Sequence, residues 1–274
     1  MAENTNVEQL VASIPDLDKN GKIDGPKPDD ADKIFEALLI GGREAVDKLL
    51  GMIREVDDGQ DWKARYVIHG LANYVCRPSK AEQRGLFVNA VVAKLGSDAP
   101  KAVKAMLIRE LQVAGEKAAV QVLGKFLADD ELYSWAASAL LAIRQGAAGE
   151  FRKALPAAKD RAKARIIQNL GLLGDAQAVA AIKQAANDGD PDVRLAVCGA
   201  LANLGDEGSV DILIEASNAE GWQRIQAAKA CLVLAEKLAA AGKKPAAQKI
   251  YRHLKETRKD DEKYLRDLAA AALG

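Results

Sequence analysis

The feature that most limits what this chain can fold into is an internal repeat near its centre. The segment DRAKARIIQNLGLLGD (160–175) aligns with PDVRLAVCGALANLGD (191–206), which places Leu170 on Leu201. Both segments end in a Gly-Asp pair, and a helical pattern precedes and follows each pair. A unit of about 31 residues with two helical patterns and a turn is typical of stacked helix pairs.

The same register extends in both directions along the chain. Equivalent leucines recur at nearly even spacing after a longer first step: Leu71, Leu111, Leu140, Leu170, Leu201 and Leu232. Apolar residues make up 49% of the chain but aromatic residues only 4%. Because Ala and Leu are strong helix formers and no period-two pattern occurs, we predict an all-α fold.

The predicted architecture is a right-handed α-α superhelix of about seven helix pairs over residues 30–274, after a polar extension over 1–29. The second helix of each pair is expected to line a concave surface. We expect the first helix over 31–40, capped by Asp29 or Asp30, and the second over 43–56. The following helices are expected over 61–75, 80–95, 99–114, 116–128, 131–144, 147–158, 161–173 and 176–187. Another begins at Pro191 with Asp190 as its cap, and one over 260–273 closes the stack.

The segment DPDVRLAVCGALANLGDEGSVDILIEA (190–216) resembles a short bacterial HEAT-like repeat of the kind also seen in phycobilin lyases. The motif arginine is Arg194, whereas the preceding unit has Lys163. The segment LAEKLAAAGKKPAAQKIYRHL resembles a tetratricopeptide-type helix pair, so the last pair, over 220–274, is expected to be tetratricopeptide-like. The resemblance implies a binding scaffold.

The charge of the chain argues against binding to nucleic acid. Lys and Arg number 39 and Asp and Glu number 39, whereas proteins that hold a phosphate backbone usually carry a basic surplus. The charge is uneven, because residues 1–61 contain 15 acidic and 7 basic side chains and residues 243–274 contain 9 basic and 5 acidic ones. This asymmetry fits either steering of a charged partner or solubilising caps.

Three widely spaced cysteines, Cys76, Cys198 and Cys231, indicate reduced, buried thiols rather than disulfides. No apolar run is long enough to span a membrane, and the first residues lack the pattern of an export signal. We therefore expect a cytoplasmic protein that binds no membrane, and a monomer is favoured. A signal that had been removed would leave the same sequence.

The most concentrated aromatic segment is WKARYVIHGLANY (62–74). Trp62, Tyr66, His69 and Asn73 recur on one helix face, and Arg65 flanks them. This face is predicted to bind a partner, because aromatic and Arg side chains supply much of the energy of interfaces. It could equally be the bulky core of a long repeat. Trp135 and Trp222 also stand near the starts of first helices, which favours packing, and a packed role is expected for His69.

An acidic loop before the first repeat resembles a calcium-binding loop. In DLDKNGKIDG, the side chains of Asp16, Asp18, Asn20 and Asp24 and the carbonyl of Lys22 match the ligand positions of an EF-hand. The position that should supply a bidentate carboxylate is Lys27, which departs from the motif. The segment is therefore either a weak calcium site or a turn-rich linker.

No sequence signature of nucleophilic, acid-base or metal catalysis occurs, so we expect no catalytic residue and no cofactor. The favoured function is a noncatalytic scaffold whose concave face binds another protein or a peptide. Two alternatives stay open. A bilin lyase or chaperone-lyase follows from the repeat resemblance alone, and a HEAT-like DNA glycosylase would need a basic groove and a catalytic carboxylate beside aromatic residues.

Overall fold

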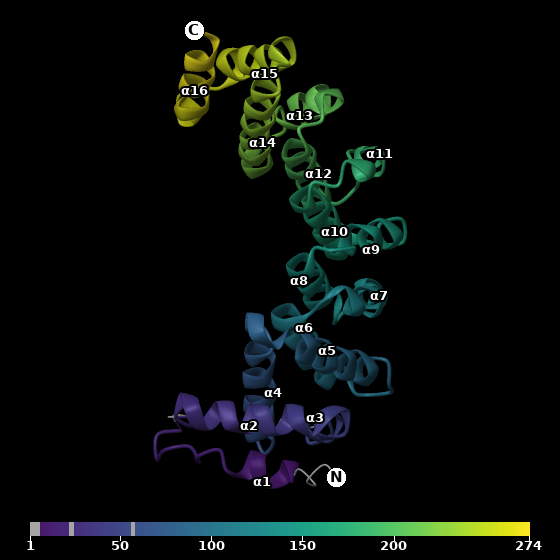
Figure 1. Cartoon of the computed structure of the whole chain (residues 1–274). Coiled ribbons are helices and arrows are strands. Elements are labelled where there is room, and N and C mark those ends of the chain that lie inside the picture. Colours follow the sequence, from purple (N-terminus) through teal and green to yellow (C-terminus); the bar gives the residue numbers. More distant parts are fainter. Residues whose placement is uncertain (1–5, 22–24, 56–57) are drawn as a thin grey trace. The chain divides into compact units, whose positions relative to one another are not determined.

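The computed structural model describes residues 6–21, 25–55 and 58–274, and in these residues it contains sixteen α-helices and no β-strand (Figure 1). The predicted all-α class is confirmed for the described residues. None of the helices in the described segments is long and apolar enough to cross a membrane. The helices are α1 (Val7–Ala12), α2 (Pro28–Ile40), α3 (Gly42–Gly51), α4 (Trp62–Tyr74), α5 (Ala81–Leu95), α6 (Lys101–Ala114), α7 (Lys117–Lys125), α8 (Tyr133–Ile143), α9 (Ala147–Ala154), α10 (Asp160–Leu173), α11 (Val179–Gln184), α12 (Pro191–Leu204), α13 (Val210–Ala216), α14 (Gly221–Ala240), α15 (Lys244–Thr257) and α16 (Lys263–Leu273).

The chain divides into two compact units, unit 1 (Met1–Ala147) and unit 2 (Ala148–Gly274). The expected helices over 131–144 and 147–158, which the repeat pattern treats as one pair, are α8 in unit 1 and α9, nearly all of which is in unit 2. The sequence pattern did not predict this division. Periodicity predicts which residues of each helix are buried, but it does not predict which helices pack into the same compact unit.

Unit 1 has two layers of helices (Figure 1). The first helices of successive pairs, α2, α4, α6 and α8, pack against one another in order, and α3, α5 and α7 form the second layer. Helix α1 packs on α3 and α4 and buries Val7 and Val11, while Ile14 is buried just after it. Part of the expected polar extension therefore belongs to the core of this unit.

Unit 2 repeats the pairing, with its first helices closest together. Helices α10 and α12 pack tightly because Gly171 has no side chain, and a Cβ there would lie 2.6 Å from the Cα of Ala200. Helices α11 and α13 are only six and seven residues long and are more widely separated. Within this unit the closer spacing puts the first helices on the inner side of the stack. The expectation that second helices line the inner surface is wrong here.

The Gly-Asp pairs of the repeat have two structural roles. Gly174 and Gly205 end α10 and α12 with φ values of 72° and 66°, a left-handed conformation that favours glycine. The aspartates that follow form ion pairs with the preceding second helix: Asp175 with Arg152, and Asp206 with Lys183 at 2.7 Å. Because Arg152 and Lys183 are separated by the same step as the two aspartates, the repeat carries an ion pair as well as an apolar pattern.

Several expected helix ends differ from the structure; for example, α9 ends at Ala154 rather than at 158, and α11 spans Val179–Gln184 rather than 176–187. Helix α2 begins at Pro28, with Lys27 at the N-cap, so Asp29 and Asp30 lie in its first turn and do not cap it. Proline suits this position because the N–H groups of the first turn have no partner within the helix, so the N–H that proline lacks costs no hydrogen bond. Helix α3 ends at Gly51 rather than at 56. In contrast, the Asp190 carboxylate caps α12 as expected, since it accepts a hydrogen bond of 2.8 Å from the backbone N–H of Asp192.

The apolar residues of α12 that recur at helical spacing form its core face, with Leu204 half-buried and the others buried: Val193, Ala196, Val197, Ala200 and Leu201. Cys198 and Cys231 are buried too, and burial raises the pKa of their thiols to about 11 and about 12. Cys76 is exposed, so its expected burial is wrong. It follows α4 in the connector to α5, where the helical pattern no longer determines which side chains point inward.

Candidate functional site

The predicted aromatic face lies along α4 in unit 1 and is not part of the core. Trp62 and Tyr66 are half-buried, whereas His69 and Asn73 are exposed. The core-facing positions of α4 are filled by aliphatic side chains, including Val67, Ile68 and Leu71. The interpretation of this cluster as bulky core, and of His69 as a packed histidine, is therefore wrong. The prediction that the face binds a partner stays a prediction.

His69 is held in place although 61% of its side chain is exposed. Its Nε2 lies 3.2 Å from Nδ2 of Asn73, and because an amide nitrogen only donates, Nε2 is the acceptor. The proton is then on Nδ1, which donates to the Glu110 carboxylate of α6 at 3.0 Å. Burial raises the pKa of Glu110, and the hydrogen bond from His69 partly offsets this. The pair links α4 to α6.

Arg65, the flanking residue of the predicted site, binds within the protein. Its Nε donates to the buried Asp61 carboxylate at 2.8 Å, and Asp61 also accepts a 2.8 Å hydrogen bond from the backbone N–H of Arg54. Burial alone would raise the pKa of Asp61, but these two donors outweigh it and the pKa is lowered. Arg65 therefore anchors the start of α4 and contributes less to the outer face than the sequence suggested.

A groove of about 330 Å³ lies between α2 and α4, beside the predicted face. Tyr66 and Asn73, both predicted site residues, line it, together with the rings of Phe35 and Tyr74. The two rings lie 5.4 Å apart between centroids. Gly70 makes room for this arrangement, because a Cβ at that position would collide with the tip of the Phe35 ring.

Paired charges surround the groove. Arg77 forms a bidentate contact with Asp32, at 2.5 and 2.9 Å, and its guanidinium stacks 4.3 Å from the Tyr74 ring centroid. Glu36 accepts hydrogen bonds from Lys80 and from the Tyr74 hydroxyl, which lower the pKa of its carboxyl. Aromatic rings therefore line the groove, and the charged side chains beside it are paired with opposite charges.

Two tryptophans assigned to packing are exposed instead. Trp135 on α8 is 42% exposed, and the guanidinium of Arg109 on α6 lies 5.3 Å from its ring centroid. Trp222 on α14 is 60% exposed. Recurrence near helix starts therefore did not predict burial for these two side chains. Arg109 and Trp135 extend the aromatic face of unit 1 over α6 and α8, an extension that the sequence pattern did not indicate.

The acidic loop is only partly described. The Asp18 carboxylate accepts a hydrogen bond of 2.8 Å from the backbone N–H of Asn20, and Gly21 has the positive φ that a sharp turn needs. The Asp16 carboxylate forms an ion pair of 2.6 Å with Lys63 of α4. The remaining candidate ligands, Lys22 and Asp24, lie outside the described residues. Within the described segments no group of three or more acidic, His or Cys side chains is arranged to hold a metal ion.

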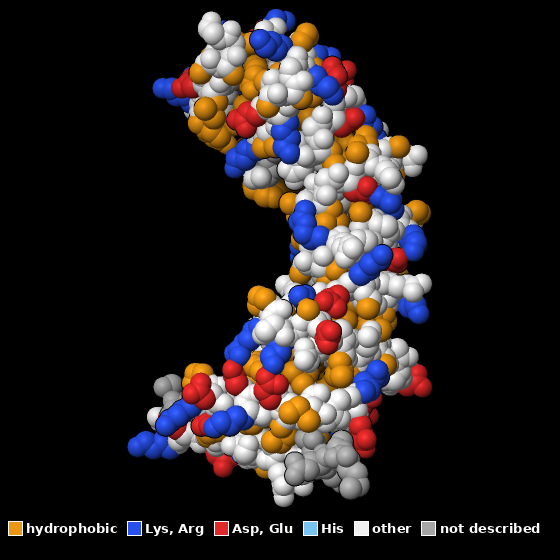
Figure 2. Space-filling model, viewed as in Figure 1, with side chains coloured by type: hydrophobic (Ala, Val, Ile, Leu, Met, Phe, Trp, Pro, Cys, Tyr) orange, Lys and Arg blue, Asp and Glu red, His pale blue; other side chains and the backbone are white. Residues whose placement is uncertain are grey.

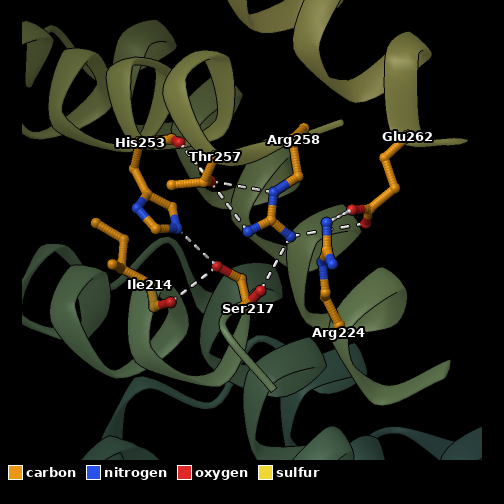
Figure 3. A network of polar contacts seen from close by, with 7 residues as sticks. All are labelled: Ile214, Ser217, Arg224, His253, Thr257, Arg258 and Glu262. Carbon is orange, nitrogen blue, oxygen red and sulfur yellow. Dashed lines mark hydrogen bonds and ion pairs between the residues drawn. The ribbon is translucent and has the colours of Figure 1, made fainter. Parts of the chain in front are cut away.

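A polar network in unit 2 contains a contact that resembles a nucleophile and its base (Figure 3). Ser217 Oγ lies 3.0 Å from Nε2 of His253 and donates to the carbonyl of Ile214 at 2.8 Å. Since a hydroxyl has a single proton, Nε2 of His253 donates to Ser217. Ser217 is fully buried at the C-terminus of α13, so this arrangement caps a helix.

Two arginines complete that network (Figure 3). Arg258 donates to the Ser217 carbonyl at 2.9 Å and lies 3.6 Å from the Glu262 carboxylate, which also pairs with Arg224. The side chains of Arg258 and Glu262 are only 2% and 3% exposed. The network connects α13, α14 and the segment between α15 and α16.

Charged side chains of both signs are interspersed over the visible face of the molecule, without a basic stripe among the described residues drawn there (Figure 2). This distribution agrees with the balanced composition of the chain.

Comparisons with known proteins place the repeat in unit 2. Residues 148–233 match the family model of HEAT repeats. Among solved structures, the chain is similar to a chain of the complex of CpcE and CpcF of phycocyanin lyase from Nostoc sp. PCC7120. The identity is 18% and the TM-score 0.45, over 94% of this chain and 99% of that one. A search of the curated proteins found no match.

Proposed function

We propose that this chain, a HEAT-like repeat protein, is a noncatalytic scaffold that binds a partner protein or peptide on the first-helix face of unit 1. That face consists of the outer surfaces of α2, α4, α6 and α8. Helical repeat arrays commonly bind partners along such extended surfaces. Fold alone does not decide function, so the proposal depends on the side chains that this face presents.

The observation that carries the proposal is a row of accessible aromatic and polar side chains on adjacent helices. Tyr66 lines the groove beside α2, His69 and Asn73 continue along α4, and the Arg109–Trp135 pair lies on α6 and α8. Tyr, Trp and Arg are the residues that most often dominate binding energy. Several of them are preorganised by hydrogen bonds or stacking, which lowers the entropy lost on binding.

Quantitative affinity capture from the native cell tests the proposal. The full chain, a Tyr66→Ala variant and a Trp135→Ala variant serve as baits, and Trp222→Ala is the matched control because it removes an exposed tryptophan from unit 2. We expect at least one protein that is retained by the wild type and the control and lost, by about tenfold or more, from the other two variants. Truncation of a hot-spot aromatic typically costs about 2 kcal/mol or more, which supports that fold-change.

The same variants separate binding from folding. Tyr66 and Trp135 are partly exposed, so we expect their melting temperatures to stay close to that of the wild type. If all four baits retain the same proteins, the first-helix face is not the binding surface. A large loss of melting temperature in Tyr66→Ala would instead assign this ring to the core.

A further inference from the structure

Unit 2 contains a second groove, separate from the proposed binding face. It has a volume of about 550 Å³ and lies between α11, α12, α13 and the start of α14. Its wall is formed by small and aliphatic side chains, including Leu195, Cys198, Ile212 and Ala219. A concave site of this size and apolar character matches the dimensions of ligand and peptide sites.

The basic side chains at this groove are already used within the protein. Lys183 forms an ion pair with Asp206 at 2.7 Å. Arg194, the motif arginine of the repeat, donates to the carbonyls of Asp188 and Gly189 at 2.7 and 3.1 Å. The ion pair neutralises Lys183, whereas Arg194 keeps its charge and directs Nη1 to two backbone carbonyls.

The acidic side chains on the opposite side have no such partner. Glu215 at the end of α13 and Glu220 before α14 both line the groove and are exposed. In the part of the chain that the structure describes, neither carboxylate forms a hydrogen bond or an ion pair. Glu215 also lies in the last turn of its helix, where unpaired carbonyl groups add to the negative potential.

We propose that this groove binds a basic amphipathic segment of a partner protein. Aliphatic side chains of the segment enter the groove against Leu195 and Ile212, and lysine or arginine side chains beside them pair with Glu215 and Glu220. The occupant is defined by charge complementarity, because an apolar wall beside two unpaired carboxylates favours a cationic ligand over an anionic one.

Fluorescence anisotropy with two labelled peptides tests this site in the full chain. One probe is a short amphipathic peptide of leucine and lysine, and the other has glutamate in place of every lysine. We expect the lysine peptide to bind at least about tenfold more tightly, with an affinity that falls as salt rises. A Glu215→Gln/Glu220→Gln variant should weaken binding of the lysine peptide by about tenfold, because it removes both ion pairs to the peptide.

Two further variants separate the groove from general charge attraction. Ala219→Trp fills the groove from an exposed position, so we expect it to fold normally and to lose binding. Glu82→Gln, an exposed substitution on α5 of unit 1, is the charge control and should leave binding unchanged. The inference is overturned if the lysine peptide does not bind at millimolar concentration. It is also overturned if both peptides bind equally, or if the groove variants and the control behave alike.

These outcomes are independent of the proposed function. Tyr66→Ala changes unit 1 only and is expected to leave the peptide affinity of the unit 2 groove unchanged.

Discussion

Glu262 is the position where one substitution should most clearly expose how unit 2 is held together. It is the carboxylate that faces both Arg224 and Arg258, and the side chains of Arg258 and Glu262 are almost completely buried (Figure 3). Glu262→Gln keeps the shape of the side chain and removes its charge. The guanidinium of Arg258 is then left in the interior without an anion.

The expected loss of free energy of unfolding follows from the burial of Arg258 and Glu262. Removing one partner of a buried ion pair destabilises a protein by about 3–5 kcal/mol, because the remaining charge is no longer compensated. Arg258 keeps its 2.9 Å hydrogen bond to the Ser217 carbonyl and its contacts with Thr257, so we expect the lower end, about 3 kcal/mol. At about 1.4 kcal/mol per factor of ten, this is roughly a hundredfold change in the opening equilibrium.

Hydrogen–deuterium exchange followed by mass spectrometry measures the effect where it arises. In a repeat array each helix pair contacts its neighbours, so faster exchange is expected in α15 and α16 and not in unit 1. Glu131→Gln is the control, because Glu131 pairs with Lys101 at 2.8 Å but is 69% exposed, and surface pairs contribute about 1 kcal/mol or less. Exchange in α16 of Glu262→Gln that stays within a few-fold of the wild type would refute the reasoning.

Three other predictions concern stability. Gly171→Ala should destabilise unit 2 by about 1–3 kcal/mol, because the new Cβ meets the backbone of Ala200. Gly199→Ala has open space around its Cβ and should stabilise the unit by about 0.5–1 kcal/mol. Urea denaturation measures both changes. Burial lowers the pKa of His253 in the folded chain. The contribution of this residue to the free energy of unfolding is therefore fully present above about pH 6.5 and is lost as the pH falls, because the unfolded chain takes up the proton more readily. His253→Gln should reduce this loss, measured as the change in urea midpoint from about pH 7 to about pH 5. Deletion of Asp175–Gly205 joins two equivalent Gly-Asp turns and should leave a shorter folded array, and loss of the helical circular dichroism per residue would contradict it.

Much of the fold could be predicted from the sequence because the repeat is encoded by local patterns. Apolar spacing located the helices, the Gly-Asp pairs located the turns after α10 and α12, and Asp190 with Pro191 located the start of α12. Each of these signals acts over a few residues, so no knowledge of the neighbouring helices is needed.

The candidate site was predicted in part. The sequence marked Tyr66 and Asn73, which line the α2–α4 groove, but it did not mark Phe35 or Arg77, which come from other elements. It also assigned Trp135 to the interior, because a large apolar side chain near a helix start gives the same pattern whether a neighbouring helix covers it or not. The apolar groove of unit 2 was not predicted at all, since its wall combines residues from four helices.

The sequence by itself determined the helical class, the repeat length, the Gly-Asp turns and the apolar face of α12, since these depend on interactions between residues that are near each other in the chain. The tertiary structure decided which helices form each compact unit, which layer of unit 2 is inner, and which aromatic and acidic side chains remain uncovered. Those properties depend on the distance between helices, and that distance is set by contacts such as Gly171 against Ala200, between residues in different repeats.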